Sequence, residues 1–326
     1  MRRAFGYDRL GGVIRALVRK QLMNARTRRS IVVGGAGFIG SHLARALLER
    51  GDAVEVIDNL SGGKREHVPD GAVFHQMDVR DFGAIASVIA GADVVFHLAA
   101  LPRVQYSIEY PRETHDVNIT GTLNVLIAAR DGNVGRVVYS GSSSAYGDQE
   151  TLPLREGMHE KPVHPYGLQK YVGEEYTRLF ADIYGLSTVT LRYFNVYGPN
   201  MDPDGPYALA IGRFLKLRKE GKPLTIVGDG EQTRDFTHVT DVVRANLLAA
   251  ESAKVGKGEA INIGSGRNIS INALAAMIGG PTVNVPPRKE SRHTLADIRL
   301  AKELLGWEPS VRIEDAIVQL RREWGI

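Results

Sequence analysis

The stretch IVVGGAGFIGS, residues 31–41, places three glycines at regular spacing directly after a short apolar run. In this G-x-x-G-x-x-G pattern, glycine permits a tight turn, a close approach of backbone to a pyrophosphate, and packing of a helix on a strand. A helical pattern follows at once, so the first amides of that helix would face the phosphates. We therefore expect a dinucleotide site that includes Gly34, Gly37, Phe38, Ile39 and Gly40.

On both sides of this turn, short β-rich runs alternate with helical patterns. Strands are predicted at residues 31–33, 53–57, 72–76, 94–98, 136–140 and 188–192. Helices are predicted at residues 38–50, 82–90, 114–130 and 166–184. Such alternation indicates βαβ units and a parallel sheet that helices cover on both faces. The nearly continuous apolar strands fit burial on both sides. The predicted fold is α/β, a doubly wound Rossmann sheet with a smaller mixed α/β lobe.

Three regions are predicted along the chain. Residues 1–29 hold nine Lys and Arg and one acid, a net charge of +8, whereas the whole chain of 326 residues carries only +4. The remainder is therefore mildly acidic, and we expect no nucleic-acid partner. Residues 30–195 should form the dinucleotide-binding domain. Residues 196–326 should form a substrate-binding lobe, with some chain crossing back to the first domain.

The basic extension allows three interpretations: a short helix packed on the body, a frayed tail, or a segment that binds an anionic membrane surface. Met23 is an alternative start. The chain contains no cysteine, which excludes disulfides and thiolate metal ligands. No apolar run is long enough to span a bilayer. We expect a cytoplasmic protein without a metal site.

An acidic residue follows the second predicted strand. Asp58 can accept hydrogen bonds from the hydroxyls of an adenosine ribose, and it would repel the 2′-phosphate of NADP. No arginine follows at once in the sequence. The sequence therefore favours NAD, with Asn59, Ser61 and Gly62 as further cofactor contacts.

Two further strand ends fit the same cofactor. Asp78 and Val79 follow the third strand, where a carboxylate and an adjacent amide can read the adenine edge. The fourth strand ends with the mostly small residues Leu98, Ala99 and Ala100, which let the backbone pass close to a dinucleotide.

Tyr166 and Lys170 open a predicted helix four residues apart, so their side chains share one face. The positive charges of Lys170 and of NAD would stabilise a phenolate and lower the pKa of Tyr166 from its ordinary value of about 10. A serine-rich segment, SGSSSAYG at 140–147, follows the fifth strand and can bond the same substrate oxygen. The pattern predicts a general base beside a hydride acceptor, which oxidation of a secondary alcohol requires.

From residue 30 onward the chain resembles the extended short-chain dehydrogenase/reductase superfamily. Within it, the chain is similar to the NAD-dependent nucleotide-sugar epimerases, close to the UDP-glucose/UDP-N-acetylglucosamine 4-epimerase group. The motifs that carry the resemblance are GGAGFIGS (34–41), VIDN (56–59), DVRD (78–81), HLAA (97–100), SSSAYGD (142–148), YGLQK (166–170), LRYFNVYGP (191–199) and GDGEQTRDF (228–236). One departure is Val33, where the family usually has a threonine that braces the glycine turn.

The resemblance implies site roles beyond those that the residue patterns indicate. The implied catalytic set is Ser142, Tyr166 and Lys170. Tyr166 and Lys170 would also touch the cofactor, together with Asn118 and Phe194. The implied substrate contacts are Ser142, Ser143, Tyr166, Asn195, Arg234, Arg288 and Thr294. Among these, Asn195, Arg234 and Arg288 would bind the nucleotide diphosphate. Arg292 is an alternative to Arg288.

Two serines bear on the type of reaction. Ser143 and Ser144 occupy positions where, in related enzymes, 4,6-dehydratases carry an Asp-Glu pair and decarboxylases carry a Glu. Chemistry at C5 of the sugar needs such an acid or base. Serine in both places therefore favours epimerisation at C4.

The resemblance also bears on the choice of sugar. Thr294 matches a position beside the C2 substituent, where a small residue leaves room for an N-acetyl group. Pro102 and Arg103 instead replace small residues that acetyl-specific members have near the sugar. The expectation is use of both UDP-glucose/UDP-galactose and UDP-GlcNAc/UDP-GalNAc.

Together these features predict an NAD-dependent UDP-hexose 4-epimerase that acts through a transient 4-keto sugar. Two alternatives stay open. One is a nucleotide-sugar dehydratase or reductase of the same superfamily, and the other is a non-catalytic NAD-binding regulator, because the fold alone does not ensure activity. The resemblance further implies a homodimer joined by the helices near 115–130 and 166–184.

Overall fold

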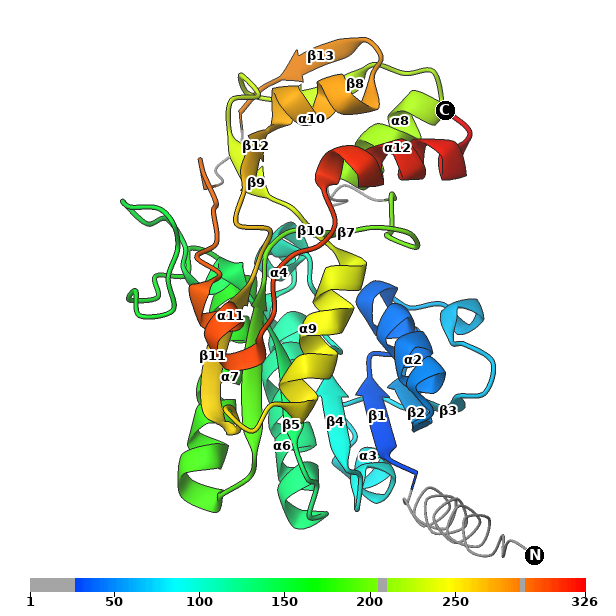
Figure 1. The fold of residues 1–326 in the computed structure, drawn as a ribbon, viewed down its shortest axis with the longest axis vertical. Helices are drawn as coiled ribbons and strands as arrows, with labels where there is room; N and C mark the ends of the chain where they lie inside the picture. The colour runs from blue at the N-terminus through cyan, green and yellow to red at the C-terminus, as the bar shows by residue number, and fades with distance from the viewer. Residues whose placement is uncertain (1–26, 205–209, 288–290) are drawn as a thin grey trace, which may run out of the picture.

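The computed structural model describes residues 27–204, 210–287 and 291–326, and its centre is a seven-stranded parallel sheet (Figure 1). The strand order is β11-β6-β5-β4-β1-β2-β3. The bounds are β1 Arg29–Val33, β2 Ala53–Asp58, β3 Val73–Gln76, β4 Val94–His97, β5 Val137–Ser142, β6 Thr188–Tyr193 and β11 Lys257–Ile263. The chain order reverses direction next to β1, as a doubly wound sheet requires. The predicted Rossmann fold is therefore confirmed.

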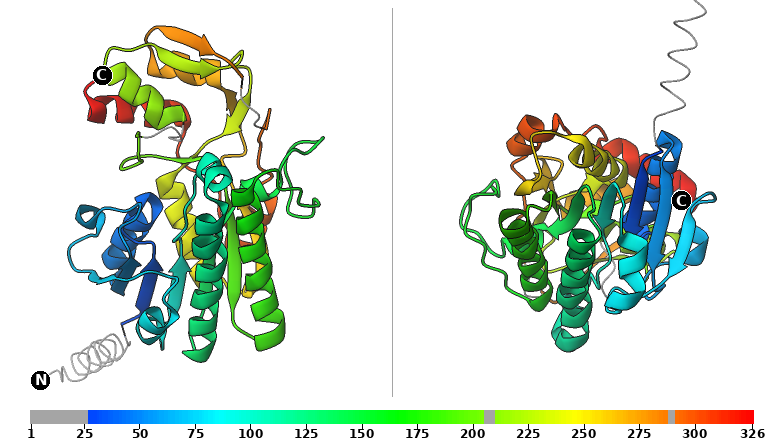
Figure 2. Two further views of the ribbon diagram at one scale, coloured as in Figure 1. Left: turned by 180° about the vertical axis from the view of Figure 1, so that it is seen from behind. Right: turned by 90° about the horizontal axis from the view of Figure 1, so that it is seen from below.

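Helices cover both faces of this sheet, and each face has its own apolar cluster. On one face lie α2 (Phe38–Arg50), α9 (Val239–Glu251) and α11 (Arg299–Leu305). On the other lie α3 (Phe82–Ile89), α6 (Gly121–Asp131) and α7 (Pro165–Tyr184). The view from behind shows α6 and α7 side by side on the outside of the sheet (Figure 2). Neighbouring residues of one strand enter opposite clusters, since Ile31 packs in one and Val32 in the other.

The helix predicted at 114–130 is divided by a π-helical turn. The segment runs through α5 (Pro111–His115), the π-helical turn η2 (Asp116–Thr120) and α6. The shorter α4 (Val104–Glu109) precedes it. A π-turn inserts one extra residue and changes which side chains face inward, and such turns are frequent at functional sites. Here the inward residue is Asn118, which is buried.

A smaller lobe lies beyond the carboxyl ends of the strands (Figure 1). Its apolar core takes most of its residues from three helices and one strand, and a second, mostly exposed strand pairs with that one. These elements are α8 (Ala210–Lys219), α10 (Ile271–Ile278), α12 (Ile313–Trp324), β8 (Leu224–Val227) and β13 (Thr282–Val285). Two further strand pairs link the lobes, β7 (Val196–Tyr197) with β10 (Thr237–His238), and β9 (Thr233–Asp235) with β12 (Asn268–Ser270).

The chain returns to the sheet after its first passage through the small lobe. β11 pairs with β6 in parallel, and α9 and α11 pack in the same apolar cluster as α2. The sequence patterns did not predict β11, because its first half, Lys257–Glu259, holds two charged residues and a glycine. The division at residue 195 stays a prediction, and we propose to assign α9, β11 and α11 to the sheet lobe.

The basic extension lies outside the described residues up to position 26. Its last arginines attach to the body. Arg28 donates to the carbonyl of Ala250 at 3.0 Å, and Arg29, the first residue of β1, pairs with Glu55 at 2.6 Å. Within the described part of the chain, the helices are too short or too polar to cross a membrane.

Candidate active site

The glycine turn after β1 requires glycine at two of its positions. Gly34 has a φ of +89°, and a Cβ there would lie 2.5 Å from the amide nitrogen of Ala99. A Cβ at Gly40 would lie 2.1 Å from the carbonyl oxygen of Gly34. The first glycine therefore lets the turn touch the end of β4, and the last lets α2 pack on the turn.

The start of α2 offers unpaired amides at this turn. Its N-cap is Gly37, and no described side chain caps the helix. Helices ordinarily satisfy their first amides with a capping side chain or with a ligand. The first turn of α2, with Phe38 and Ile39, therefore fits an anionic group such as a pyrophosphate. This arrangement supports the expected dinucleotide.

Asp58 holds the glycine turn to the end of β2. One carboxylate oxygen accepts from the amide of Ala36 at 3.0 Å, and the other accepts from Leu60 at 2.8 Å. Burial raises the pKa of this carboxyl, and the two amide bonds oppose that rise. Each oxygen keeps a further lone pair for a ribose hydroxyl. The fit to an unphosphorylated ribose, and therefore to NAD, is good.

The other expected cofactor contacts lie close by. Asn59 donates to Asp78 at 2.8 Å and accepts from the amide of Ser61 at 2.9 Å. A salt bridge from Arg80 at 2.6 Å holds the pKa of Asp78 well below its ordinary value. The structure thus joins the ends of β2 and β3 in one polar cluster.

The end of β4 is connected to the catalytic helix. The amides of Leu98 and Ala99 both donate to the carbonyl of Val33, at 2.8 and 2.9 Å. Asn118 accepts from the amide of Leu101 and donates to Gln169 on α7, both at 2.8 Å. Asn118 therefore joins the segment after β4 to α7, and it reaches both because of the π-helical turn.

Two glycines let α7 lie directly on β5. A Cβ at Gly167 would lie 2.6 Å from the carbonyl oxygen of Ser144, and one at Gly173 would lie 2.2 Å from the hydroxyl of Tyr139. With glycine at both places, the helix packs closely on the strand and on the short turn η3 (Ser143–Ala145) that follows it. This packing brings Tyr166 to Ser142.

The phenol of Tyr166 and the hydroxyl of Ser142 lie together at the carboxyl end of β5. Burial raises the pKa of Tyr166 above its ordinary value, and a hydrogen bond with Ser142 lowers it in part. Ser142 is the last residue of β5 and also accepts from the amide of Ser144 at 3.2 Å. A strand end and a helix start therefore fix the two hydroxyl groups.

Lys170 lies one turn further along α7 and is buried. Its Nζ donates to the carbonyl of Ser140 at 2.7 Å and lies 4.8 Å from the centre of the Tyr139 ring. Burial lowers the pKa of Lys170 to about 7. Tyr166 and Lys170 lie one turn apart on α7, and Ser142 lies beside Tyr166, so the three expected catalytic residues form one cluster.

The expected substrate residues come from three different segments. Asn195, at the end of β6, has a φ of +30° and donates to the carbonyl of Asp235 at 2.8 Å and to the Thr294 hydroxyl at 3.5 Å. Arg234 on β9 donates to the carbonyl of Thr233 at 2.9 Å. A non-glycine residue in the left-handed region is strained, and such strain gathers at functional sites. The structure brings Asn195, Arg234 and Thr294 together.

Of the two remaining arginines, Arg288 and Arg292, the structure describes only Arg292. Arg288 lies outside the described residues. Arg292, its alternative, forms an exposed ion pair with Asp229 at 2.7 Å. Its guanidinium is directed to that carboxylate. The choice between Arg288 and Arg292 as a diphosphate ligand stays a prediction. Arg103, expected near the sugar, pairs with Asp202.

Asp235 is a residue that the sequence patterns did not single out. Its carboxylate is fully buried and accepts from Ser265 (amide at 2.6 Å, hydroxyl at 2.7 Å) and from the amides of Gly266 and Ala296, both at 3.0 Å. Its own amide donates to Thr294 at 3.3 Å. The sequence signal for a buried Asp235 was its place at the end of a short strand, directly before Phe236. Asp235 therefore holds the segments that carry the substrate residues.

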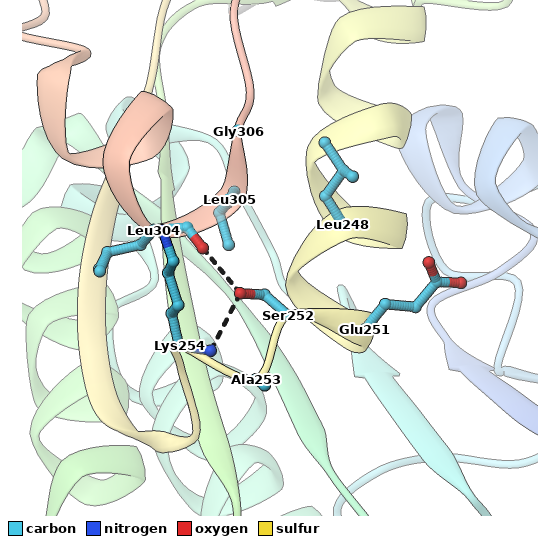
Figure 3. Close-up of a pocket in the computed structure, with 8 residues that line it drawn as sticks. All are labelled: Leu248, Glu251, Ser252, Ala253, Lys254, Leu304, Leu305 and Gly306. Atoms are coloured by element: carbon cyan, nitrogen blue, oxygen red, sulfur yellow. Dashed lines mark hydrogen bonds between the residues drawn. The ribbon is translucent and has the colours of Figure 1, made fainter.

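Two of the surface hollows in the described part of the chain bear on the location of the site. One, of about 420 Å³, lies where α9 and α11 end, at the amino ends of the strands (Figure 3). There Ser252 donates to the carbonyl of Leu304 at 2.7 Å. This hollow is remote from Tyr166. The other, of about 290 Å³, lies beside the substrate residues between segments 148–152 and 292–293. The described residues contain no cluster of potential metal ligands.

Comparison with known proteins agrees with this geometry. Residues 30–264 match the model of the NAD dependent epimerase/dehydratase family. A putative UDP-glucose 4-epimerase of Methanocaldococcus jannaschii is 39% identical over 297 residues, which cover 88% of this chain and 95% of that protein.

Solved structures are similar over nearly the same length. The UDP-glucose 4-epimerase of Thermotoga maritima, solved with UDP-glucose, has a TM-score of 0.87 at 39% identity and covers 91% of this chain and 98% of its own. The UDP-N-acetylglucosamine 4-epimerase of Methanobrevibacter ruminantium, solved with UDP-N-acetylmuramic acid, has a TM-score of 0.86 at 34% identity, with coverages of 92% and 97%.

Proposed function

This chain belongs to the NAD-dependent epimerase/dehydratase family, and from that premise we propose that it is an NAD-dependent UDP-sugar 4-epimerase. The observation that carries the proposal is the cluster of Ser142, Tyr166 and Lys170 beside the glycine turn. Ser143 and Ser144, where a dehydratase would have acids, form the turn that follows. The cluster fits alcohol oxidation and return, and it lacks the acid pair for elimination at C5.

We propose that NAD binds along the carboxyl ends of β1 to β4. The pyrophosphate would lie at Gly34, Gly37 and Gly40, and the adenosine ribose at Asp58. When bound, NAD supplies the hydride acceptor and donor for C4 of the sugar. The chain's own part is to place the sugar hydroxyl and to move its proton.

Tyr166 would accept and return the proton of the C4 hydroxyl of the sugar. As a phenolate it accepts the proton of the C4 hydroxyl, and as a phenol it returns that proton after the hydride has come back to the other face. Ser142 donates a hydrogen bond to the same oxygen. The Lys170 ammonium, one turn along the same helix, would stabilise the phenolate by charge attraction. Its hydrogen bond to the Ser140 carbonyl keeps it on the inner side of the helix.

The substrate side supports a nucleoside diphosphate sugar. Arg234 suits charge-assisted recognition of a diphosphate, and Asn195 lies beside it. We propose that Arg288 adds a second positive charge. The small Thr294 leaves room at C2, so we propose that both UDP-galactose and UDP-GalNAc are substrates. The relative solved with UDP-N-acetylmuramic acid supports a site that admits an N-acetyl group.

An assay with several nucleotide sugars tests the proposed reaction. The purified protein is incubated with UDP-galactose, UDP-GalNAc, and GDP- and dTDP-linked sugars, and the anomeric proton is followed by NMR. We expect equilibration of C4 for the UDP-sugars with no net change in NAD. Formation of a 4-keto-6-deoxy sugar would show a dehydratase instead. NAD binding without any turnover would show a non-catalytic regulator.

We also propose that the protein is a homodimer of the cytoplasm. The outer face of α7 carries the exposed apolar side chains Leu168, Leu179 and Ile183, with exposed fractions of 49%, 38% and 65%. An exposed apolar stripe on one helix, next to the parallel α6, is typical of a helix–helix interface. A second copy of the same pair would cover it in a four-helix arrangement.

A further inference from the structure

The first turn of α7 differs from that of α2 because side chains satisfy its amides. The helix begins at Pro165, which has no amide hydrogen. The amide of Gly167 donates to Nδ1 of His164, the N-cap residue, at 3.0 Å. The amide of Leu168 donates to the carbonyl of His164 at 3.2 Å. The second bond is the ordinary first backbone bond of the helix. The His164 side chain therefore takes one amide, that of Gly167, which a helix start leaves without an intrahelical partner.

The amide that remains belongs to Tyr166 itself. It donates to the hydroxyl oxygen of Ser107, on α4, at 3.0 Å. Ser107 is fully buried, and its own hydroxyl donates to the carbonyl of Val104 at 2.6 Å. The orientation of the Ser107 oxygen is therefore fixed from its own helix. A residue 59 positions away in the sequence caps the backbone of the tyrosine.

His164 also touches the phenol ring. The His164 and Tyr166 rings are nearly parallel, with 13° between their planes and 6.2 Å between their centres. Nδ1 can accept from Gly167 only when it carries no proton, so a ring proton of neutral His164 lies on Nε2. Burial lowers the pKa of His164, which keeps the imidazole neutral at neutral pH.

We propose that His164 and Ser107 are positioning residues that hold the backbone of Tyr166 and so fix its phenol against Ser142 and Lys170. The inference rests on the proposed function of Tyr166 as the proton acceptor. Phosphates do not compete for this helix start, because its amides are taken by the chain. In α2 the same positions stay free of described side chains. The start of α2 therefore suits a bound anion. The start of α7 instead suits a side chain that must stay in one position, that of Tyr166.

Three substitutions of His164 separate its two contacts. His164→Asn keeps an N-cap acceptor and removes the ring. His164→Phe keeps a ring and removes the acceptor, and His164→Ala removes both. We expect kcat of the Asn variant within about threefold of the wild type, and a loss of about tenfold or more in the Phe and Ala variants, because small displacements of a reacting group cost on the order of 10²-fold. KM for the UDP-sugar should change less than kcat, since other residues bind the diphosphate.

Ser107→Ala tests the second contact, and Asp81→Ala is the matched control. Asp81 is the exposed N-cap of α3 and accepts from the amide of Ala84 at 3.1 Å. Both substitutions remove one helix cap. Ser107→Ala should lower the unfolding temperature at least as much as Asp81→Ala, because it also leaves buried backbone groups without partners. We expect kcat to fall several-fold in Ser107→Ala and to stay unchanged in Asp81→Ala.

Amide hydrogen exchange of the NAD-bound protein gives a readout that does not depend on turnover. We expect the amides of residues 166 and 167 to lose protection in His164→Phe and His164→Ala but not in His164→Asn. Full activity and full protection in all three variants would overturn the proposal, as would activity in Phe but not in Asn. A wild type that epimerises no UDP-sugar would refute the proposed function, whereas exchange would still decide whether these residues hold the helix start.

Discussion

At the scale of the residue, the proposed proton transfer depends on the phenol of Tyr166. Replacing it by Phe removes that oxygen and leaves the ring and the helix in place. We expect kcat of Tyr166→Phe to fall by about 10²- to 10⁴-fold, the usual contribution of a general acid or base. Epimerisation of UDP-galactose, followed by NMR, measures the loss.

The control for this substitution is the cofactor content. NAD released on denaturation should equal that of the wild type, because the residues at the glycine turn are unchanged. Turnover that persists at the wild-type rate would remove Tyr166 from the proposed role.

The buried His97, near Lys170, is expected to make the stability of the folded protein depend on pH. Its Nε2 lies 2.9 Å from the Thr122 hydroxyl, which itself donates to the carbonyl of Asn118 at 2.7 Å, so Nε2 is the donor. Nδ1 is buried without a hydrogen-bond partner among the described residues. Burial, with the nearby Lys170 charge, lowers the pKa of His97 to about 3. A second ring proton would have no acceptor.

The sign of the resulting pH dependence follows from linkage. The folded-state pKa lies below the ordinary 6.5, so the unfolded chain binds more protons between these two values. Stability should therefore fall as pH falls from 6.5 towards 3, by about 2 kcal/mol at pH 5. Gln can keep the donor to Thr122 and does not titrate, so His97→Gln should lose less stability over this range. Urea unfolding at pH 7 and pH 5 measures the difference, and equal losses in both proteins would contradict the assignment.

At the scale of the element, α7 depends on glycine where it touches β5. In Gly173→Ala the new Cβ would lie 2.2 Å from the Tyr139 hydroxyl. We expect the helix to shift away from the strand, with a loss of about 1–3 kcal/mol in stability from overpacking. Because Lys170 on this helix is held by the Ser140 carbonyl, kcat should fall as well.

A second substitution checks the cause of that loss. Tyr139→Phe removes the atom closest to the new methyl group, so the double variant should recover part of the stability and activity of Gly173→Ala. No recovery at all would show that Gly173 matters for another reason. Thermal unfolding and the UDP-galactose assay report the two quantities.

The features that could be predicted from the sequence are those that depend on residues close together in the chain. The glycine turn, Asp58 at the end of β2 and the Tyr166–Lys170 spacing each depend on residues within a few positions. The fold and the family predicted from them are confirmed. The π-helical turn at Asn118 was not predictable, because the 3.6-residue apolar pattern continues through it and the turn is fixed by contacts with α7.

Residues that act across long sequence distances were also missed. Ser107 caps an amide 59 positions away, and Asp235 binds amides of segments 30 and 61 positions away. The sequence around Ser107 does not distinguish it from a serine at the surface, and Phe236 is the only local signal noted for Asp235. Only the packing of separate elements reveals that these polar groups are buried and fully bonded.

At the scale of the whole molecule, the exposed apolar face of α7 makes the oligomeric state testable. We expect the wild type to elute with the mass of a dimer in light scattering. Ile183→Glu places a charge at the most exposed apolar position of that face and should shift the mass towards a monomer. Val318→Glu is the matched control, since Val318 is 48% exposed on α12 in the other lobe. A monomeric wild type, or equal masses in all three proteins, would exclude this interface.

The late position of β11 in the chain has a consequence for synthesis. β6 is complete at Tyr193, but its neighbour at the sheet edge ends only at Ile263. While the intervening seventy residues leave the ribosome, β6 is an edge strand with unpaired backbone groups and apolar side chains. At the usual pace of translation this interval lasts several seconds to over ten seconds. Nascent chains stalled between these two points should therefore bind chaperones or aggregate, whereas chains stalled beyond α11 should not.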